Sequence, residues 1–291
     1  MRRSSRLQTI TPALLRGTPL PLDGRADKDQ RGSVLVIGGT RQVPGAAILA
    51  SVGALRAGAG KLQIGVPESV SLYVATAIPE ALVMPLKERS GTIAASAARE
   101  VIERAERVDA IALGPGMPQN GCEAFVCDVV KGSRKPVVLD AGALSACARA
   151  GDLGGIAVLT PHAGEMATLL ACDREKIEAD PERFATAAAQ RFNAIVALKG
   201  PATYIAEPHG RCMVNRAGHV GLATSGSGDA LAGIIAGILA RGVDPFMAAA
   251  WGVYLHASAG RVLGRRMGIG FLAHEVLAEI PALMKRLSAR N

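Results

Sequence analysis

The stretch Gly221-Leu222-Ala223-Thr224-Ser225-Gly226-Ser227-Gly228-Asp229 decides how this chain is interpreted. A run of small residues ends in one acid, and the helix-periodic segment 230–240 follows directly. Glycine permits tight turns and close approach to a ligand, and the N–H groups at a helix start suit bound phosphate. Asp229 could take a proton from a hydroxyl beside that phosphate. Alternatively, Ser227 or Asp229 could simply cap the helix.

The remaining sequence alternates strand-length apolar runs with helical segments. Strands are expected at 34–37, 61–66, 81–86, 109–113, 137–139, 156–159 and 194–198, with a hairpin at 204–207 and 212–215. Helices are expected at 46–57, 69–77, 94–107, 122–131, 143–149, 165–170, 181–192, 230–241, 246–264 and 272–287. This order predicts a single-domain α/β fold, doubly wound, with a mostly parallel sheet and helices on both faces.

The bulk composition supports a buried sheet and a reducing compartment. The chain is 49% hydrophobic but only 3% aromatic, as expected for an aliphatic core around a parallel sheet. No apolar run approaches the ~18 residues of a membrane span, so no membrane partner is expected. Five cysteines without a CxxC pair or clustered histidines indicate neither a disulfide framework nor a zinc site. The basic segment Met1–Arg6 lacks the apolar core of a secretion signal, so a cytoplasmic location is expected.

The formal charge of +8 is spread along the chain rather than clustered. Aromatic stacking partners are scarce, so nucleic-acid binding is not expected. A basic balance would also attract a small polyphosphate ligand.

Other expected strand ends carry residues suited to ligand binding. Gly114-Pro115-Gly116 follows strand 109–113, and Lys199 begins the stretch Lys199-Gly200-Pro201-Ala202-Thr203 after strand 194–198. Open α/β sheets bind ligands at the carboxyl ends of their strands. The glycine-proline turn alone is equally a plain tight turn. Neither the dinucleotide GxGxxG fingerprint nor a Walker A frame is present.

Two acids have both a structural and a functional interpretation. Asp140, after strand 137–139, could hold a metal-bound water or cap the next helix. Glu165 lies three positions after His162 and could bond back to the loop in a capping box. Since this spacing differs from that of the HExxH zinc helix, His162 is expected to make a polar contact rather than bind metal.

Eight motifs occur in a specific order: VLVIGG, PGAA, LRAGAG, LGPG, VVLDA, LTPHxGE, LKGPAT and GSGDALAGII. This order resembles the ADP-dependent (S)-NAD(P)H-hydrate dehydratase family, which has the ribokinase-like fold. The resemblance runs from about Gly32 to the C-terminus, so residues 1–31 are expected to be a leader segment and 32–291 the domain. The epimerase domain fused to this one in some members has no counterpart in the sequence.

The resemblance implies an enzyme that restores NADH or NADPH from its S hydrate. ADP is the co-substrate and is consumed to AMP and phosphate, with Mg²⁺ expected beside the nucleotide on ligands that the resemblance does not name. It also implies a homo-oligomer, with a homotetramer as the expected form.

The resemblance implies a role for each matching residue. Asp229 matches the presumed general base beside the substrate hydroxyl, and the amides of Gly226, Ser227 and Gly228 would hold the moving phosphoryl group. The residues that match the AMP-binding positions are Lys199, Gly200, Pro201, Ala202, Thr203 and Gly228. Those that match positions contacting the hydrated dinucleotide are Ala46, Gly116, His162 and Asp229.

A few positions depart from the family pattern. Ser225 replaces a glycine, Ala163 replaces a proline, and Gly142 replaces a second acid after Asp140. The loop usually written GNxGM reads GHVGL at 218–222. Activity would be weakened if the second acid serves metal or substrate. Since Asp229 is retained, an active enzyme is expected.

Two other functions remain open at this point. A small-molecule kinase of the same fold, acting on a hydroxyethylthiazole or pyridoxal, would also use a GSGD loop. A non-catalytic nucleotide sensor would need no acid at position 229.

Overall fold

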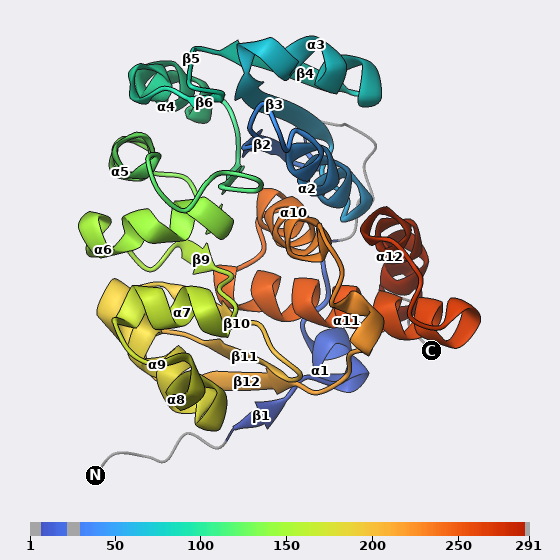
Figure 1. The fold of residues 1–291 in the computed structure, drawn as a ribbon. Coiled ribbons are helices and arrows are strands. Elements are labelled where there is room, and N and C mark those ends of the chain that lie inside the picture. Colours follow the sequence, from blue (N-terminus) through green and yellow to red (C-terminus); the bar gives the residue numbers. More distant parts are fainter. Residues whose placement is uncertain (1–6, 22–29, 289–291) are drawn as a thin grey trace.

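Ten strands of the described residues form one sheet, in the order β1-β12-β11-β10-β9-β8-β7-β2-β3-β4. The structure, a computed structural model, describes residues 7–21 and 30–288 (Figure 1). Only the β10–β11 and β11–β12 pairings are antiparallel among these strands, which confirms the mostly parallel sheet. The strands are β1 (Gln8–Thr9), β2 (Ser33–Ile37), β3 (Lys61–Pro67), β4 (Ala81–Leu86), β7 (Ala110–Leu113), β8 (Val137–Leu139), β9 (Ala157–Leu159), β10 (Ile195–Leu198), β11 (Thr203–Ala206) and β12 (Cys212–Asn215).

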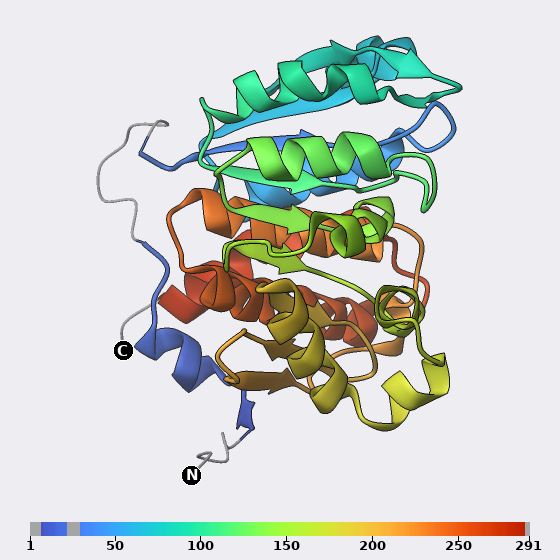
Figure 2. The same cartoon turned by 90° about the vertical axis from the view of Figure 1, so that its left-hand side faces the viewer.

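Helices cover both faces of this sheet (Figures 1 and 2). One layer holds α1 (Pro12–Gly17), α2 (Gly45–Arg56), α3 (Glu68–Ala77), α10 (Ser227–Ala240), α11 (Pro245–Met267) and α12 (Ala273–Ser288). The other holds α4 (Ala98–Ala105), α5 (Glu123–Gly132), α6 (Cys147–Ala150), α7 (Ala163–Leu170), α8 (Arg174–Ala179) and α9 (Pro181–Phe192). Along β2, Val34 packs into the first core and Leu35 into the second, because strand side chains alternate between faces. The doubly wound prediction is therefore confirmed.

Helix α10 is fixed by close backbone contact with α2. A side-chain carbon at Gly233 would lie 1.9 Å from the carbonyl oxygen of Ala50, and one at Gly237 would lie 2.4 Å from that of Ala54. Only glycine allows the two helices to approach this closely. Since α10 also contacts β7 and β8, its N-terminus is held at the carboxyl ends of the central strands.

Most expected elements match the structure to within one to three residues, and the differences lie in short helical pieces. The helix expected at 143–149 is a 3₁₀ turn, η2 (Ala141–Ala146), followed by α6. The helix expected at 94–107 likewise begins as a 3₁₀ turn, η1 (Ala95–Ala97). Helix α8 was not predicted, because its six residues are mostly polar. A small hairpin of β5 (Glu88–Arg89) and β6 (Thr92–Ile93) was also not predicted.

Residues 7–21 pack on the edge of the sheet. Strand β1 pairs in parallel with β12, and the side chain of Leu15 is fully buried. Trp251 donates a hydrogen bond to the carbonyl oxygen of Thr18, so α11 contacts this segment. This segment also forms the short helix α1. The prediction made for Met1–Arg6 concerns residues outside the described ranges. No helix within those ranges is long and apolar enough to cross a membrane.

Candidate active site

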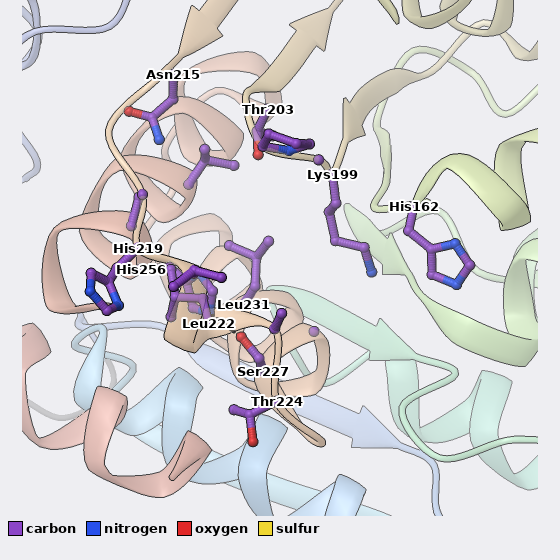
Figure 3. Close-up of a pocket in the computed structure, with 18 of the residues that line it drawn as sticks. His162, Lys199, Thr203, Asn215, His219, Leu222, Thr224, Ser227, Leu231 and His256 are labelled. Atoms are coloured by element: carbon purple, nitrogen blue, oxygen red, sulfur yellow. Dashed lines mark hydrogen bonds between the residues drawn. The ribbon is translucent and has the colours of Figure 1, made fainter. Parts of the chain in front are cut away.

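A pocket of about 800 Å³ opens where β10 and β12 end and α10 begins (Figure 3). Lys199 and His162 lie on one wall, with Thr203 and Asn215 at the strand ends and Ser227 and Thr224 at the start of α10. Its apolar surface comes from Leu222, Leu231, Val253 and Ala257. A long pocket with an apolar part and one charged end fits a nucleotide.

The N-terminus of α10 has no side-chain cap. Gly226 occupies the N-cap position in the left-handed region, at φ 82°, and no side chain accepts from the first-turn amides. The amides of Gly228 and Asp229 have no acceptor among the residues that the structure describes. The capping interpretation of Ser227 and Asp229 is therefore wrong. Free amides and the positive end of the helix dipole are suited to bind an anion.

Lys199 extends from the end of β10 to the start of α10. Its Nζ atom lies 3.0 Å from Oδ1 of Asp140 and 3.8 Å from Oε2 of Glu165. A side-chain carbon at Gly228 would lie 3.2 Å from this Nζ, so the ammonium lies against the first turn of α10. Burial opposes the charge on Lys199, but the carboxylates of Asp140, Glu165 and Asp229 outweigh it and raise its pKa. The lysine is therefore cationic at any working pH.

Asp140 faces this lysine rather than the helix that follows it. Its Oδ1 accepts from Nζ of Lys199 and, at 2.7 Å, from Oγ1 of Thr160, and it caps no backbone amide. The capping alternative for Asp140 is therefore wrong. At Gly142, where the family pattern has a second acid, any side chain would meet the carbonyl oxygen of Pro118 within 2.1 Å. The backbone around Gly142 thus leaves no room for that acid.

Within residues 7–21 and 30–288, no three acidic, histidine or cysteine side chains cluster as a metal site. Mg²⁺ is commonly held by one or two carboxylates together with water and substrate phosphates. The buried carboxylate of Asp140, beside the uncapped start of α10, fits an ion that would arrive with a nucleotide.

Asp229 has an environment suited to a base at neutral pH. Burial and the negative charge of Asp140 raise its pKa to about 6. Lys199 and a hydrogen bond from the Gly116 amide act in the opposite direction. A carboxyl group with a pKa near the working pH is both ionised and basic enough to accept a proton.

Ala46 and Gly116 lie together beside Asp229, outside the pocket lining. A side-chain carbon at Gly116, whose φ is 71°, would lie 2.6 Å from Cβ of Ala46. Three of the four residues matched to the dinucleotide are therefore adjacent. His162, the fourth, lies instead beside Lys199, because β9 and β10 continue into a bridge between them.

The predicted capping box at α7 is confirmed. The amides of Gly164 and Glu165 donate to Nδ1 of His162 at 3.0 and 3.2 Å, and the His162 amide donates to Glu165 at 2.7 Å. Since Nδ1 is an acceptor, the neutral imidazole carries its proton on Nε2. The N–H of His162 is therefore on Nε2, which lies 3.6 Å from Oε2 of Glu165.

The segment matched to AMP lies mostly in the pocket. Lys199, Gly200, Pro201, Thr203 and Gly228 all line it, whereas Ala202 does not. Sequence reasoning gave no role to Asn215, Arg216 or His256, which line the same pocket. A lone histidine in the apolar segment 246–264 carries no signal that separates a ligand contact from a core residue.

The fold and the site together define a class. A ribokinase-like α/β sheet, a free helix start, a buried lysine and a carboxyl group with a raised pKa form the components of a phosphoryl-transfer enzyme. The NAD(P)H-hydrate dehydratase family model matches residues 34–282, and the chain belongs to that family.

Comparisons with individual proteins agree. The chain is 47% identical to an ADP-dependent (S)-NAD(P)H-hydrate dehydratase of Xanthomonas campestris over 97% of this chain and 98% of that protein. It resembles the structure of the ADP/ATP-dependent NAD(P)H-hydrate dehydratase of Bacillus subtilis co-crystallized with ATP/Mg²⁺, with a TM-score of 0.84, 30% identity and coverage of 98% of this chain and 100% of that one.

Two further comparisons concern a kinase of the same fold and relatives that are longer than this chain. A hydroxyethylthiazole kinase of Pyrococcus horikoshii shares the fold alone, with a TM-score of 0.59, 19% identity and coverage of 89% of each chain. The chain spans about half the length of the bifunctional NAD(P)H-hydrate repair enzymes that it matches.

Proposed function

We propose that this protein dehydrates the S form of hydrated NADH or NADPH to NADH or NADPH, with conversion of ADP to AMP and phosphate. The observation that carries the proposal is the position of Asp229, at the uncapped start of α10 and close to Lys199. Membership of the family and the relatives' activities support it.

In the first step the substrate's ring hydroxyl attacks the terminal phosphorus of ADP. The hydroxyl proton passes to the carboxylate of Asp229 as the new P–O bond forms, and the P–O bond to AMP breaks with its electron pair leaving on AMP. The amides of Gly226 and Gly228, with Lys199, stabilise charge on the phosphoryl oxygens. Positioning is therefore the main task of the site.

In the second step the phosphate leaves the ring. The C–O bond breaks with its electrons on phosphate, while the lone pair of the ring nitrogen stabilises the positive charge on the carbon. A proton then passes from the neighbouring carbon to the released phosphate, and the C–H electrons restore the double bond. Phosphate is a far better leaving group than hydroxide, and this is the reason for consuming ADP.

The two ligands are assigned to the two sides of the α10 start. The pocket containing Lys199, Gly200, Pro201 and Thr203 takes the AMP portion, and Ala46, Gly116 and Asp229 face the hydrated ring. His162 lines the pocket assigned to AMP, so its contact with the dinucleotide is made from that side of the site. Ala202 is included in the AMP segment only through its backbone.

Mg²⁺ bound to the nucleotide phosphates would neutralise part of their charge. Asp140 is the residue that would hold it, through water, because its carboxylate faces the helix start beside Lys199. A cytoplasmic location and a homotetrameric assembly complete the proposal, and light scattering of the purified protein tests the assembly.

The direct test supplies chemically prepared hydrated NADH with ADP or with ATP and follows the recovery of reduced-nicotinamide absorbance. Recovery with ADP, with one AMP formed for each NADH, is expected. Recovery with ATP alone would overturn the donor assignment. No recovery with either nucleotide, together with phosphorylation of a hydroxyethylthiazole or pyridoxal, would replace the proposal with the kinase function.

A further inference from the structure

A buried serine–histidine pair lies in the pocket wall, between the start of α10 and the middle of α11. Oγ of Ser227 is 3.0 Å from Nε2 of His256. Their residues are only 6% and 9% exposed, and both line the pocket. The mechanism above uses neither side chain.

The amide of Ser227 is not the group that this residue can offer to an anion. It already donates to the carbonyl oxygen of Thr224, at 3.3 Å, whereas the Gly228 amide beside it is free. The hydroxyl of Ser227 is therefore the donor that the residue can contribute, if its hydrogen is directed into the pocket.

The chemical state of His256 decides where that hydrogen points. Burial, together with the positive charge of Lys199, lowers the pKa of His256 to about 4, so the ring is neutral at neutral pH. The ring nitrogen that faces Oγ of Ser227 can donate or accept, according to the tautomer of the ring. A ring nitrogen that donates to Ser227 leaves the hydroxyl hydrogen free, because a neutral imidazole has one donor and one acceptor.

We propose that His256 donates through Nε2 to Ser227 and thereby turns the Ser227 hydroxyl toward the terminal phosphoryl group of the nucleoside diphosphate. Ser227 is then a catalytic hydrogen-bond donor, and His256 is a positioning residue that acts through it. The inference rests on the proposed function. Its geometric basis is that Lys199, Gly228, Ser227 and His256 line the same pocket, and that Gly228, next to Ser227 in the chain, lies against Nζ of Lys199.

The competing explanation is structural. The pair could simply satisfy two buried polar groups and hold α10 against α11, since an unpaired polar group in the interior is costly. Loss of the pair would then lower thermal stability and leave turnover of the folded protein unchanged. Both explanations therefore predict a change in stability or activity, but only the catalytic one predicts a lower kcat.

The test compares five single variants and one double variant with wild type in the hydrated-NADH assay. Ser227→Ala removes the hydroxyl. His256→Leu removes the contact because leucine has no polar group, and His256→Asn removes it because asparagine is too short to reach Ser227. His256→Gln keeps an N–H donor at a similar distance. Ser258→Ala is the matched control, because Ser258 is a buried serine on the same helix that bonds Arg261 and does not line the pocket.

We expect kcat to fall about 10- to 100-fold in Ser227→Ala, as for loss of a hydrogen bond to a charged group, with the calorimetric Kd for ADP within about threefold of wild type. His256→Leu and His256→Asn fall similarly, and His256→Gln recovers most of the loss. The double variant Ser227→Ala/His256→Leu is no slower than the slower single variant, because the two residues act as one unit.

A kcat within about twofold of wild type in Ser227→Ala would overturn the inference, because removal of a donor that acts on charge costs more than this. Losses that multiply in the double variant would overturn the role of His256. If His256→Leu fails to fold, the comparison of Asn with Gln at position 256 decides. An inactive wild-type protein would instead overturn the proposed function, so the two failures are distinguishable.

Discussion

Two helices begin at this site, and their first turns are satisfied in opposite ways. At α7, the side chains of His162 and Glu165 close a capping box, so its first amides are bonded within the protein. At α10, Gly226 occupies the cap position without any side-chain bond. A helix start is therefore not in itself a phosphate site. Its amides must also be left free and lie beside a cation, as those of α10 lie beside Lys199.

Lys199 lies between the two helix starts and links them. Its Nζ contacts Glu165, from the capped helix, and lies against Gly228, in the uncapped one. The capped helix thus helps to position the ammonium group of Lys199. The same ammonium group lies beside the free amides of the uncapped helix, where both could contact one anion. Substitutions at Asp229, Lys199 and His162 test this difference between the two helix starts.

Asp229→Asn has the largest expected effect. Without a base for the substrate hydroxyl, kcat falls on the order of 10³-fold, within the range typical of general bases. The Kd for ADP, measured by calorimetry, stays within about threefold of wild type, because the free amides of α10 remain. Near-normal turnover in this variant would remove Asp229 from the chemistry.

The same variant is expected to be more stable than wild type well above pH 6. The pKa of Asp229 is raised from 3.8 to about 6 in the folded state, so the folded protein binds more protons than the unfolded one between these values. Stability is therefore lost as pH rises through this window, by at most about 3 kcal/mol. Denaturant unfolding measures the gain, and a loss of stability in Asp229→Asn would contradict the assigned burial of charge.

Lys199→Met has the next largest effect, a fall in kcat of about 100-fold, comparable to loss of an electrostatic donor to the transition state. The positive charge of Lys199 lowers the pKa of Asp229, so its removal raises that pKa above about 6. The acid limb of the pH–rate profile is therefore expected to move to higher pH than in wild type. The limb is measured as kcat/KM against pH, which reports the pKa of the free enzyme. An unchanged limb would show that Lys199 does not act on Asp229.

Two substitutions at His162 separate its cap from its ligand contact. His162→Ala removes the cap of α7 and should cost about 0.5–2 kcal/mol of stability. His162→Asn keeps an N-cap acceptor and should recover most of that stability, yet raise the KM for hydrated NADH as His162→Ala does. Chemical unfolding measures the stability of each variant, and steady-state kinetics measures its KM for hydrated NADH. Equal stability of the two variants would refute the importance of the cap.

Inorganic phosphate should give the smallest effect and the most direct comparison of the helix starts. Millimolar phosphate is expected to raise the unfolding temperature of the wild-type protein modestly, because it binds the folded state alone. The rise should disappear in Lys199→Met and persist in His162→Ala. Persistence in both would place the bound anion away from α10.

The alternating apolar runs were enough to predict the sheet, both helix layers and nearly every strand, because buried parallel strands are continuous apolar segments bounded by glycine and proline. The sequence also indicated which strand ends carry chemistry, including Lys199 and Asp229. The sequence could not show whether α10 has a side-chain cap, because Ser227 is a residue type that often caps helices. In the structure the N-cap position is instead Gly226, in the left-handed region, and no side chain bonds to the first amides.

Other features depended on packing between distant segments. The role of Asp140 followed from its contacts with Thr160 and Lys199, which come from two neighbouring strands. The pairing of His256 with Ser227 joins two helices, and no local pattern near position 256 announces it. The short helix α8 lacks the apolar periodicity that made the longer helices predictable.

The central claim is that the substrate hydroxyl is phosphorylated at the start of α10 before it leaves. Hydrated NADH whose ring hydroxyl carries a heavy oxygen isotope tests it most directly, with the released phosphate and water analysed by mass spectrometry. The account predicts that the label appears in inorganic phosphate, in an amount equal to the NADH formed. Label found in water, with phosphate that takes its oxygen from the solvent, would contradict it.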